Sequence, residues 1–187
     1  MKLKILKFKS VKSTNTEAIR LIKTGKSNIG LITTEKQTNG RGTMGKKWIS
    51  QKGNLFISIF FKVNLTKIKI ESFLKINSKT IKKILSEYTK NVITIKYPND
   101  LMIKKKKLCG ILQETIEYKS KKYLVTGIGI NTMVSPKNKN FSSTCLKDNA
   151  VSNFNNQVII RKIQKFYENL IKDLEKKSLS YIEKKYT

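Results

Sequence analysis

The sequence predicts an α+β protein with a central mixed, mostly antiparallel sheet flanked by helices. Two observations lead to this fold class. Several segments rich in β-branched and aromatic residues, typical of strands, are bounded by turn sequences. Other segments carry apolar residues at steps of three and four, the spacing of an amphipathic helix. A chain of 187 residues is the size of one ordinary domain, so we expect a single domain over residues 1–187.

The N-terminal half is expected to begin with a half-buried or edge strand over residues 2–8, where Lys alternates with apolar residues. A helix should follow. Thr14 and Glu17 have the spacing of a capping box at its start, and Gly25 is placed to end it. The other elements expected in this half are strands at residues 29–34 and 54–63 and a helix at residues 70–88.

The C-terminal half is expected to continue the sheet. The strand at residues 92–97 should stop at the turn 98–100, in which Pro presets the backbone. The polar stretch 132–156 is typical of a long surface loop, and a last helix should run through residues 160–174. The remaining strands are expected at residues 101–103, 108–116 and 123–131.

Composition narrows the chemistry. The chain has 40 Lys and Arg against 12 Asp and Glu, a net charge of +28, and no His. A His-dependent base, triad or metal site is therefore excluded, and we expect no metal held by protein ligands alone, because two Cys are too few for a thiolate zinc site. The sequence has no stretch long enough to cross a membrane. We expect a cytoplasmic protein with no membrane partner, in which Cys109 is a small core residue.

Four segments could carry chemistry. The glycines of residues 40–45 let the backbone approach a ligand, and Arg41 could neutralise an anion there, although a flexible hairpin loop would have the same composition. Residues 96–100 place a cation and a carboxylate around a rigid turn, or form a turn that caps its own backbone. Lys107 leads into a strand containing Gly110, but a single Lys is usually a solvated surface residue. Residues 127–131 alternate Gly with apolar residues before Asn131.

Together with Ser13-Thr14-Asn15, these segments follow the order S-T-N, G-R-G-x-x-G-[KR]-x-W, K-[WY]-P-N-D-L, K-L-x-G-I-L and G-I-G-I-N. This order resembles the catalytic domain of biotin–protein ligases, also called biotin–[acetyl-CoA-carboxylase] ligases. The resemblance covers residues 13–131 at the level of motifs and the final helix more loosely. It implies the sheet architecture of biotin and lipoate ligase catalytic domains.

The resemblance also implies a two-step reaction. Biotin and ATP, with Mg²⁺, give biotinyl-5′-AMP and pyrophosphate, and a Lys of a biotin carboxyl carrier protein then takes the biotin as an amide. Lys107 matches the cation that bridges the biotin carboxylate and the α-phosphate, Asp100 the carboxylate that orients the carrier Lys, and Arg41 the catalytic loop cation. The matching biotin contacts are Ser13, Thr14, Asn15, Gln37, Gly40, Arg41, Gly42, Thr43, Lys107, Gly110 and Gly129. The matching nucleotide contacts are Arg41, Trp48, Lys96, Lys107 and Asn131.

This sequence departs from the family in three ways. Relatives often have Arg where Thr43 stands. Many continue into a small C-terminal β domain, which we expect to be absent, and some begin with a helix-turn-helix, so no DNA partner is expected. The oligomeric state is left open, with a homodimer as one option. Two rival functions are a lipoate or octanoyl ligase of similar fold and a basic nucleic-acid-binding protein, although the Lys excess fits an AT-rich genome better than a nucleic-acid role.

Overall fold

The computed structural model describes residues 2–64, 68–137 and 141–186. Its strands are β1 (Ile5–Val11), β2 (Gly30–Gln37), β3 (Leu55–Lys62), β4 (Ile93–Lys96), β5 (Asp100–Ile103), β6 (Lys106–Tyr118) and β7 (Lys121–Ile130). They form one seven-stranded sheet in the order β1-β2-β3-β7-β6-β5-β4. β1 and β2 are parallel, and every other neighbouring pair is antiparallel. The expected mixed, mostly antiparallel sheet is confirmed.

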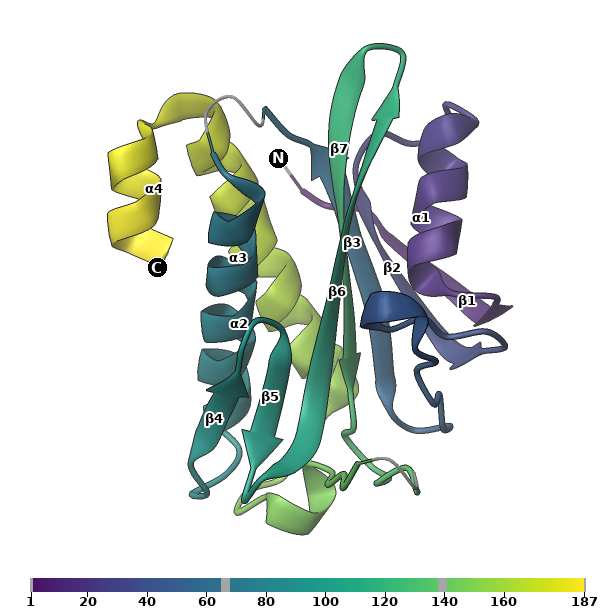
Figure 1. The fold of residues 1–187 in the computed structure, drawn as a ribbon, viewed down its shortest axis with the longest axis vertical. Coiled ribbons are helices and arrows are strands. Elements are labelled where there is room, and N and C mark those ends of the chain that lie inside the picture. The colour runs from purple at the N-terminus through teal and green to yellow at the C-terminus, as the bar shows by residue number, and fades with distance from the viewer. Residues whose placement is uncertain (1, 65–67, 138–140, 187) are drawn as a thin grey trace.

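Helices cover both faces of the sheet (Figure 1). One face carries α1 (Thr14–Lys23), which makes the crossover between the parallel strands β1 and β2. The other face carries α2 (Ile70–Ser86) and α3 (Asn156–Lys176), with α4 (Leu179–Tyr186) packed beside them. The sheet is therefore the middle layer, and its central strands are buried on both sides.

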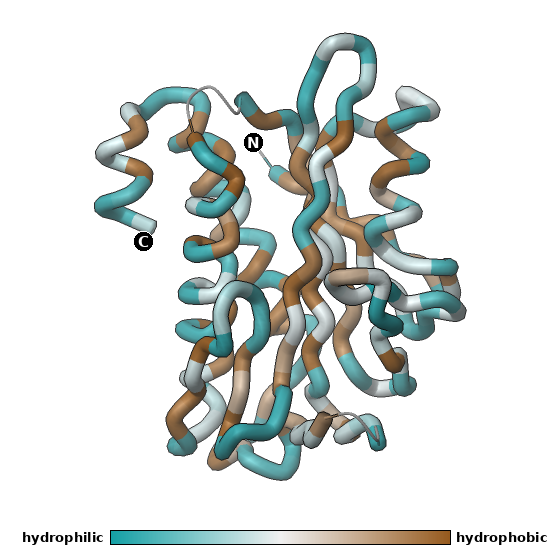
Figure 2. Tube along the Cα trace, in the orientation of Figure 1, coloured by the Kyte–Doolittle hydropathy of each residue, from teal (hydrophilic) through white to brown (hydrophobic). Residues whose placement is uncertain are grey.

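Alternation along β3 divides its side chains between two cores. Ile57, Ile59 and Phe61 belong to the large core shared with α2 and α3, whereas Phe60 packs in a smaller core against α1. Because a strand covered on both faces needs apolar residues at successive positions, the run Leu55–Lys62 shows little alternation in sequence. In Figure 2 the brown, apolar stretches follow the sheet and the inward sides of the helices.

Two expectations at the N-terminus are corrected by the structure. The first strand begins later than expected, at Ile5, and runs to Val11, although it is the edge strand that the Lys alternation predicted. The capping box is wrong: Ser13 is the N-cap residue, and Thr14 is already helical. Glu17 pairs instead with Arg20, one turn further along α1.

Two expectations at the C-terminus also need correction. The stretch 132–156 is not simply a surface loop, because Thr132, Cys145 and Leu146 are buried and residues 147–149 form a 3-10 turn; residues 138–140 lie outside the described residues. The short helix α4 was not expected, since the apolar spacing ends in α3 and α4 buries Ile182 alone. Within the described ranges, no helix is long and apolar enough to span a membrane.

Candidate functional site

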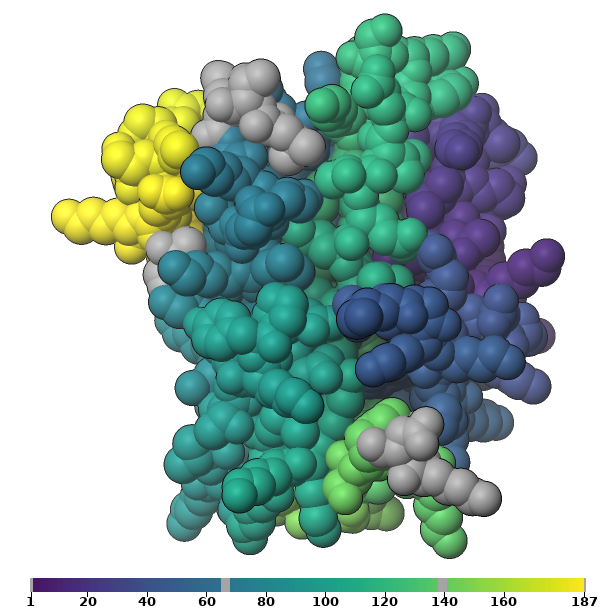
Figure 3. Space-filling view, viewed as in Figure 1, coloured from purple at the N-terminus to yellow at the C-terminus, as the bar shows by residue number. Residues whose placement is uncertain are grey.

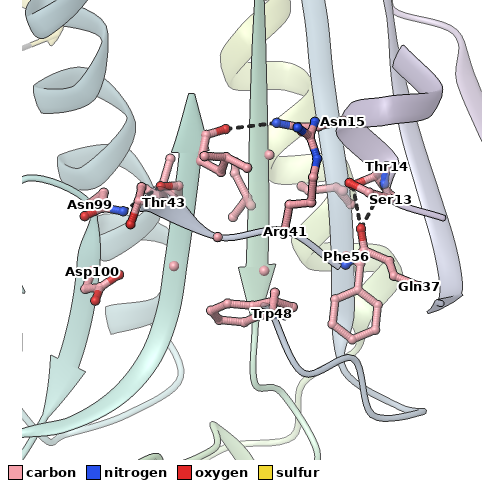
Figure 4. A pocket seen from close by; sticks show the side chains of 18 of the residues that line it. Ser13, Thr14, Asn15, Gln37, Arg41, Thr43, Trp48, Phe56, Asn99 and Asp100 are labelled. Atoms are coloured by element: carbon pink, nitrogen blue, oxygen red, sulfur yellow. Dashed lines mark hydrogen bonds between the residues drawn. The ribbon is translucent and has the colours of Figure 1, made fainter. Parts of the chain in front are cut away.

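A pocket lies on the α1 face of the sheet, over strands β6 and β7. Its walls come from the start of α1, the end of β2, the loop after β2 and the start of β5 (Figure 4). Of the predicted site residues, the structure brings together Ser13, Thr14, Asn15, Gln37, Arg41, Gly42, Thr43, Trp48, Asp100, Lys107, Gly110 and Gly129. Segments far apart in sequence therefore converge on one hollow, as the motif order implied.

The N-terminus of α1 is held by Gln37 at the end of β2. The backbone N–H of Thr14 donates to Gln37 Oε1 at 2.8 Å, and the Thr14 hydroxyl donates to the same oxygen at 3.2 Å. Gln37 Nε2 in turn donates to the Ser50 hydroxyl at 3.0 Å. The side chain of Gln37, from strand β2, thus satisfies the backbone N–H of Thr14. In the expected capping box, the side chain of Glu17 would have satisfied this N–H. The Ser13 side chain makes no cap hydrogen bond and lines the pocket.

Asn15 and Arg41 meet at Glu114. The two terminal nitrogens of Arg41 donate to the two oxygens of Glu114 at 3.0 and 2.7 Å, a bidentate ion pair. Asn15 Nδ2 donates to Glu114 Oε2 at 2.7 Å. Figure 4 shows the Arg41 side chain running towards Asn15 and away from Trp48. The predicted catalytic arginine is therefore anchored at the α1 end of the pocket.

Lys107 and Asp100 form the second ion pair of the pocket. Lys107 Nζ lies 2.7 Å from Asp100 Oδ1, and both side chains are about four-fifths buried, with 20% and 21% exposure. The antiparallel pairing of β5 with β6 brings them together near the turn that contains Lys104 and Lys105. Lys107 Nζ also lies 5.4 Å from the centre of the Trp48 ring, within the range of a cation–π contact. Lys107 is thus not a solvated surface lysine.

Two glycines form a bare patch on the pocket floor. Gly110 of β6 and Gly129 of β7 face each other directly in the register of the two strands. A Cβ at Gly110 would lie 2.6 Å from the Trp48 ring, and one at Gly129 would lie 2.5 Å from it. The indole of Trp48 therefore rests on backbone, and its Nε1–H is buried with no hydrogen-bond partner among the described residues. The space over these glycines, which was predicted to admit biotin, is occupied by the Trp48 indole in this structure.

Asn99 ties the turn before β5 to the floor of the pocket. Its Nδ2 donates to the Ile111 carbonyl at 2.9 Å, and its own carbonyl accepts from the Ile111 N–H at 2.9 Å. The alternative expectation, a turn that caps its own backbone, is wrong for this side chain. Asp100 is the next residue, so this double contact with β6 also fixes the backbone position from which the Asp100 side chain extends.

The loop after β2 closes on itself as a small hairpin. Arg41 pairs with Lys47 in an antiparallel bridge, and the Gly42 N–H donates to the Lys46 carbonyl at 2.7 Å. Met44 at its tip has a φ of 54° and is 92% exposed. In the space-filling view this dark blue segment lies against the teal surface of the β4–β5 region (Figure 3). Thr43 and Asn99 line the pocket from these two sides.

Three predicted site residues do not line the pocket. Gly40 is buried behind it, where a Cβ would lie 2.6 Å from the Trp48 carbonyl oxygen, so its role is to let two stretches of the loop approach. Lys96 is exposed at the end of β4. Asn131 is 2% exposed, and its Nδ2 donates to the carbonyls of Lys107 and Thr144. Asn131 therefore supports the backbone of Lys107, and its Oδ1 is buried with no hydrogen-bond partner in the part of the chain that the structure describes.

Sequence reasoning missed Glu114, Ser58 and Asn99. Glu114 could have been found, because Gly110, Leu112 and Glu114 alternate along one strand and so share a face with the pocket floor. Ser58 gives no sequence signal, since its hydroxyl donates to Asn15 Oδ1 from within an apolar strand. Cys109, the neighbour of Gly110, is a core residue as expected, and burial raises the pKa of its thiol well above the usual range.

Comparison with known proteins places this pocket in a family. The sequence matches the model of the Biotin/lipoate A/B protein ligase family over residues 7–131, a range that contains every residue lining the pocket. The chain belongs to this family.

Curated relatives of this biotin/lipoate ligase family chain are longer proteins. The Bifunctional ligase/repressor BirA of Bacillus subtilis is 32% identical over 108 residues, which are 57% of this chain and 33% of the relative. The protein of the same name from Bacillus spizizenii is 31% identical over 144 residues, 76% of this chain and 43% of the relative. The chain thus spans less than half the length of either relative.

Solved structures confirm the expected fold type within the family. A biotin protein ligase from Aquifex aeolicus in complex with biotin and ATP superposes with a TM-score of 0.74 at 29% identity, covering 92% of this chain and 72% of that one. The biotin protein ligase from Leishmania major in complex with biotin gives 0.72 at 25%, covering 85% and 70%. A lipoate protein ligase from Thermoplasma acidophilum, at 0.62 and 10% identity, shares the fold alone.

Proposed function

We propose that this chain activates biotin with ATP to biotinyl-5′-AMP and transfers the biotin to a lysine of a biotin carboxyl carrier protein. The observation that carries the proposal is the position of Lys107, a largely buried cation beside the carboxylate of Asp100, at the edge of a pocket floored by two facing glycines. Structural relatives bound to biotin and ATP support the same assignment.

In the first step a biotin carboxylate oxygen attacks the α-phosphorus of ATP, and pyrophosphate leaves. Two anions must approach each other, so a cation between them lowers the barrier most in the transition state. Lys107 carries three donors on a compact charge, and its Nζ forms an ion pair with Asp100. These donors are available for the carboxylate and the phosphate. No histidine is needed, because the attacking carboxylate is already ionised.

In the second step the neutral amine of the carrier lysine attacks the biotinyl carbonyl carbon, AMP leaves, and the amine loses a proton. We propose that Asp100 orients this amine, since it lines the pocket next to Lys107. The lysine needs an acceptor for its proton and a fixed direction of approach, and a carboxylate supplies both.

Biotin itself is proposed to lie over Gly110 and Gly129 once the Trp48 indole, which rests on both glycines in this structure, has moved aside; the absence of a Cβ then lets a flat ring approach the sheet. The polar groups of Ser13 and Thr14 at the start of α1 lie beside this floor and are the proposed partners of its ureido group. Trp48 is the proposed partner of the nucleotide base. Lys96 and Asn131 do not line the pocket, so they could contact the nucleotide only if it extends beyond the pocket.

Mg²⁺ is proposed to accompany ATP as a phosphate-bound ion. Among the residues that the structure describes, no group of three His, Cys, Asp or Glu gathers in a way that could hold a metal. This donor set fits Mg²⁺, which usually takes one or two carboxylates together with substrate phosphates. The ion, when bound, supplies charge neutralisation at the phosphates.

The carrier and the compartment also remain proposals. The net charge of +28 would attract an acidic carrier domain and speed its encounter with the pocket. The two free cysteines, Cys109 and Cys145, fit a reducing compartment such as the cytoplasm.

The test is ATP-dependent transfer of labelled biotin to a purified biotin carboxyl carrier domain, followed by mass spectrometry of the carrier. The expected result is one biotin added, with pyrophosphate released. Lipoate offered under the same conditions separates the rival ligase, and transfer of lipoate instead of biotin would contradict the proposal. Tight, ATP-independent binding to nucleic acid that weakens steeply with salt, without biotin transfer, would favour the basic nucleic-acid-binding reading.

A further inference from the structure

Glu114 of β6 bonds to two pocket residues from separate segments of the chain, Asn15 at the start of α1 and Arg41 in the loop after β2. Its two oxygens receive the terminal nitrogens of Arg41 at 3.0 and 2.7 Å, and its Oε2 also receives Asn15 Nδ2 at 2.7 Å. Each of these contacts is assisted by charge on the carboxylate and is therefore stronger than a bond between neutral groups. One carboxylate thus orients a guanidinium of the loop and an amide of α1.

The partners of Glu114 have little freedom left. Asn15 Nδ2 also donates to the Leu112 carbonyl at 3.2 Å, and Asn15 Oδ1 accepts from the Ser58 hydroxyl. A Cβ at Gly127 would lie 2.4 Å from Asn15 Oδ1, so the amide is packed tightly against β7. The amide of Asn15 is therefore immobilised by the protein, and an acceptor lone pair on its Oδ1 is what it can still offer to a ligand.

Arg41 is also restricted, because two of its five N–H donors are directed at Glu114. Its two terminal nitrogens are engaged by Glu114, whereas its Nε is buried and has no partner among the described residues. Because a guanidinium is planar and rigid, fixing its forked end also fixes the direction of the Nε–H. The pair is partly shielded, with 37% exposure for Arg41 and 24% for Glu114.

Charge also argues for a specific role. A lone carboxylate near a pocket for anionic substrates would repel them, but the Arg41 pair cancels that charge. The chain has few acidic residues, 12 against 40 basic ones, yet one of the 12, Glu114, is placed beside this pocket and paired with Arg41. The carboxylate thus directs Arg41 and Asn15 without adding net negative charge to the site.

We infer that Glu114 is a positioning residue, which holds the loop of residues 41–47 on β6 and sets Arg41 and Asn15 for the ligand. The identity of that ligand as biotin rests on the proposed function, whereas the hold on the loop does not. A loop already anchored at Arg41 loses less conformational entropy when a ligand binds under it. Glu114 touches neither reacting atom and acts through its two partners.

The first experiment is tryptic cleavage of the full chain without added ligand. Trypsin must draw the Arg41 side chain into its own pocket to cut the Arg41–Gly42 bond, which the bidentate pair with Glu114 opposes. Glu114→Gln leaves one acceptor oxygen and adds a competing donor, so cleavage at Arg41 should accelerate about tenfold, the loss expected for one charge-assisted pair. Glu117→Gln, an exposed residue of the same strand, is the control and should leave the rate unchanged.

The second experiment measures biotin-dependent pyrophosphate release. Glu114→Gln should raise the KM for biotin about tenfold with a much smaller change in kcat, and Glu114→Asp, which keeps the charge, should restore part of the loss. If the wild-type chain releases no pyrophosphate, the proposed function fails. The cleavage experiment still tests whether Glu114 holds the loop of residues 41–47 on β6.

Three outcomes would overturn the inference. Unchanged cleavage at Arg41 in Glu114→Gln would show that the carboxylate does not hold the loop. An equal acceleration at Lys62, the last residue of β3, would show a general loss of stability instead of a local role. Faster cleavage at Arg41 with an unchanged KM for biotin would sink the claim that the anchored pair serves the ligand.

Discussion

Lys107 and Asp100 lie 2.7 Å apart on neighbouring strands, so the cation assigned to the first step and the carboxylate assigned to the second are each other's partner. Before any substrate binds, the two charges compensate each other and each is spared from being buried alone. Substitution of one partner therefore also changes the surroundings of the other, so both half-reactions have to be measured in each variant.

Lys107→Ala should abolish most adenylate formation while leaving the fold intact, because the reaction loses the cation between its two anions. A single electrostatic donor of this kind is worth about 3–4 kcal/mol elsewhere, so pyrophosphate release should fall by about 10²–10³. Lys106→Ala, the exposed neighbour on the same strand, is the matched control. Near-normal pyrophosphate release from the Lys107 variant would remove Lys107 from the catalytic role.

Asp100→Asn should slow transfer more than activation. Lys107 keeps its charge in this variant and loses its competing partner, so biotinyl-AMP should still form, whereas the acceptor lysine loses its orienting carboxylate. We expect the intermediate to accumulate in a single-turnover experiment and the carrier to be labelled at least about tenfold more slowly. Asp148→Asn, in the loop after β7, controls for charge. Equal damage to both half-reactions would instead place Asp100 with the metal or with the scaffold of the loop.

Gly129→Ala should displace Trp48, the single tryptophan of the chain. A Cβ at this position would lie 2.5 Å from the indole, a distance that forces the ring to move. The ring should move towards solvent, because backbone lies beneath it, and the fluorescence maximum should shift to longer wavelength. Lys121→Ala, exposed at the far end of β7, should leave the emission unchanged. An unshifted spectrum for Gly129→Ala would mean that the indole does not rest on this patch.

Thr43→Arg should lengthen the lifetime of bound biotinyl-AMP. Thr43 lines the pocket from the loop and offers one hydroxyl, whereas Arg would offer a fixed charge and forked donors to the anionic intermediate. Each ~1.4 kcal/mol gained corresponds to a tenfold slower release. The measurement is the dissociation of labelled biotinyl-AMP at constant salt. Release as fast as from the wild type would show that the neighbouring lysines already supply this charge.

Both thiols should be unreactive in the folded protein. Burial raises the pKa of Cys109 and also that of Cys145, so each stays protonated near pH 8. Because the raised pKa of Cys109 lies above its unfolded value, this contribution to stability is present below about pH 8.5 and is lost as the pH rises further. Ellman's reagent should label both cysteines only after unfolding in urea. Rapid labelling of the native chain would contradict the burial of these groups.

Much of the fold could be predicted because the local signals are strong. The apolar spacing of α2 and α3 and the turn before Asp100 were read correctly. The start of α1 was not, because its donor is satisfied by Gln37, 23 positions away from Thr14, and no local pattern reports a distant partner. The helix α4 was not predicted for a related reason. It is stabilised mainly by packing against neighbouring helices, which no local pattern reports.

The candidate site was likewise predicted only in part. Motif order placed Lys107, Asp100 and Arg41 in one pocket, which the structure supports as geometry. It did not reveal that both cations carry carboxylate partners, because Glu114 is 73 positions from Arg41 and lies in no motif that was considered. Motif order also did not reveal that the side-chain amide of Asn131, a predicted nucleotide contact, donates to the backbone carbonyl of Lys107.

The strand order has a consequence for how the chain is made. β3 pairs with β2 on one side and with β7 on the other, so its second edge has no partner until synthesis has passed Ile130. That edge belongs to an apolar strand, the kind of surface that associates with other unfinished chains. A ribosome-bound fragment ending before β7 should therefore depend on chaperones, and the pocket, which needs β6 and β7 side by side, appears only after this exposed edge has been closed.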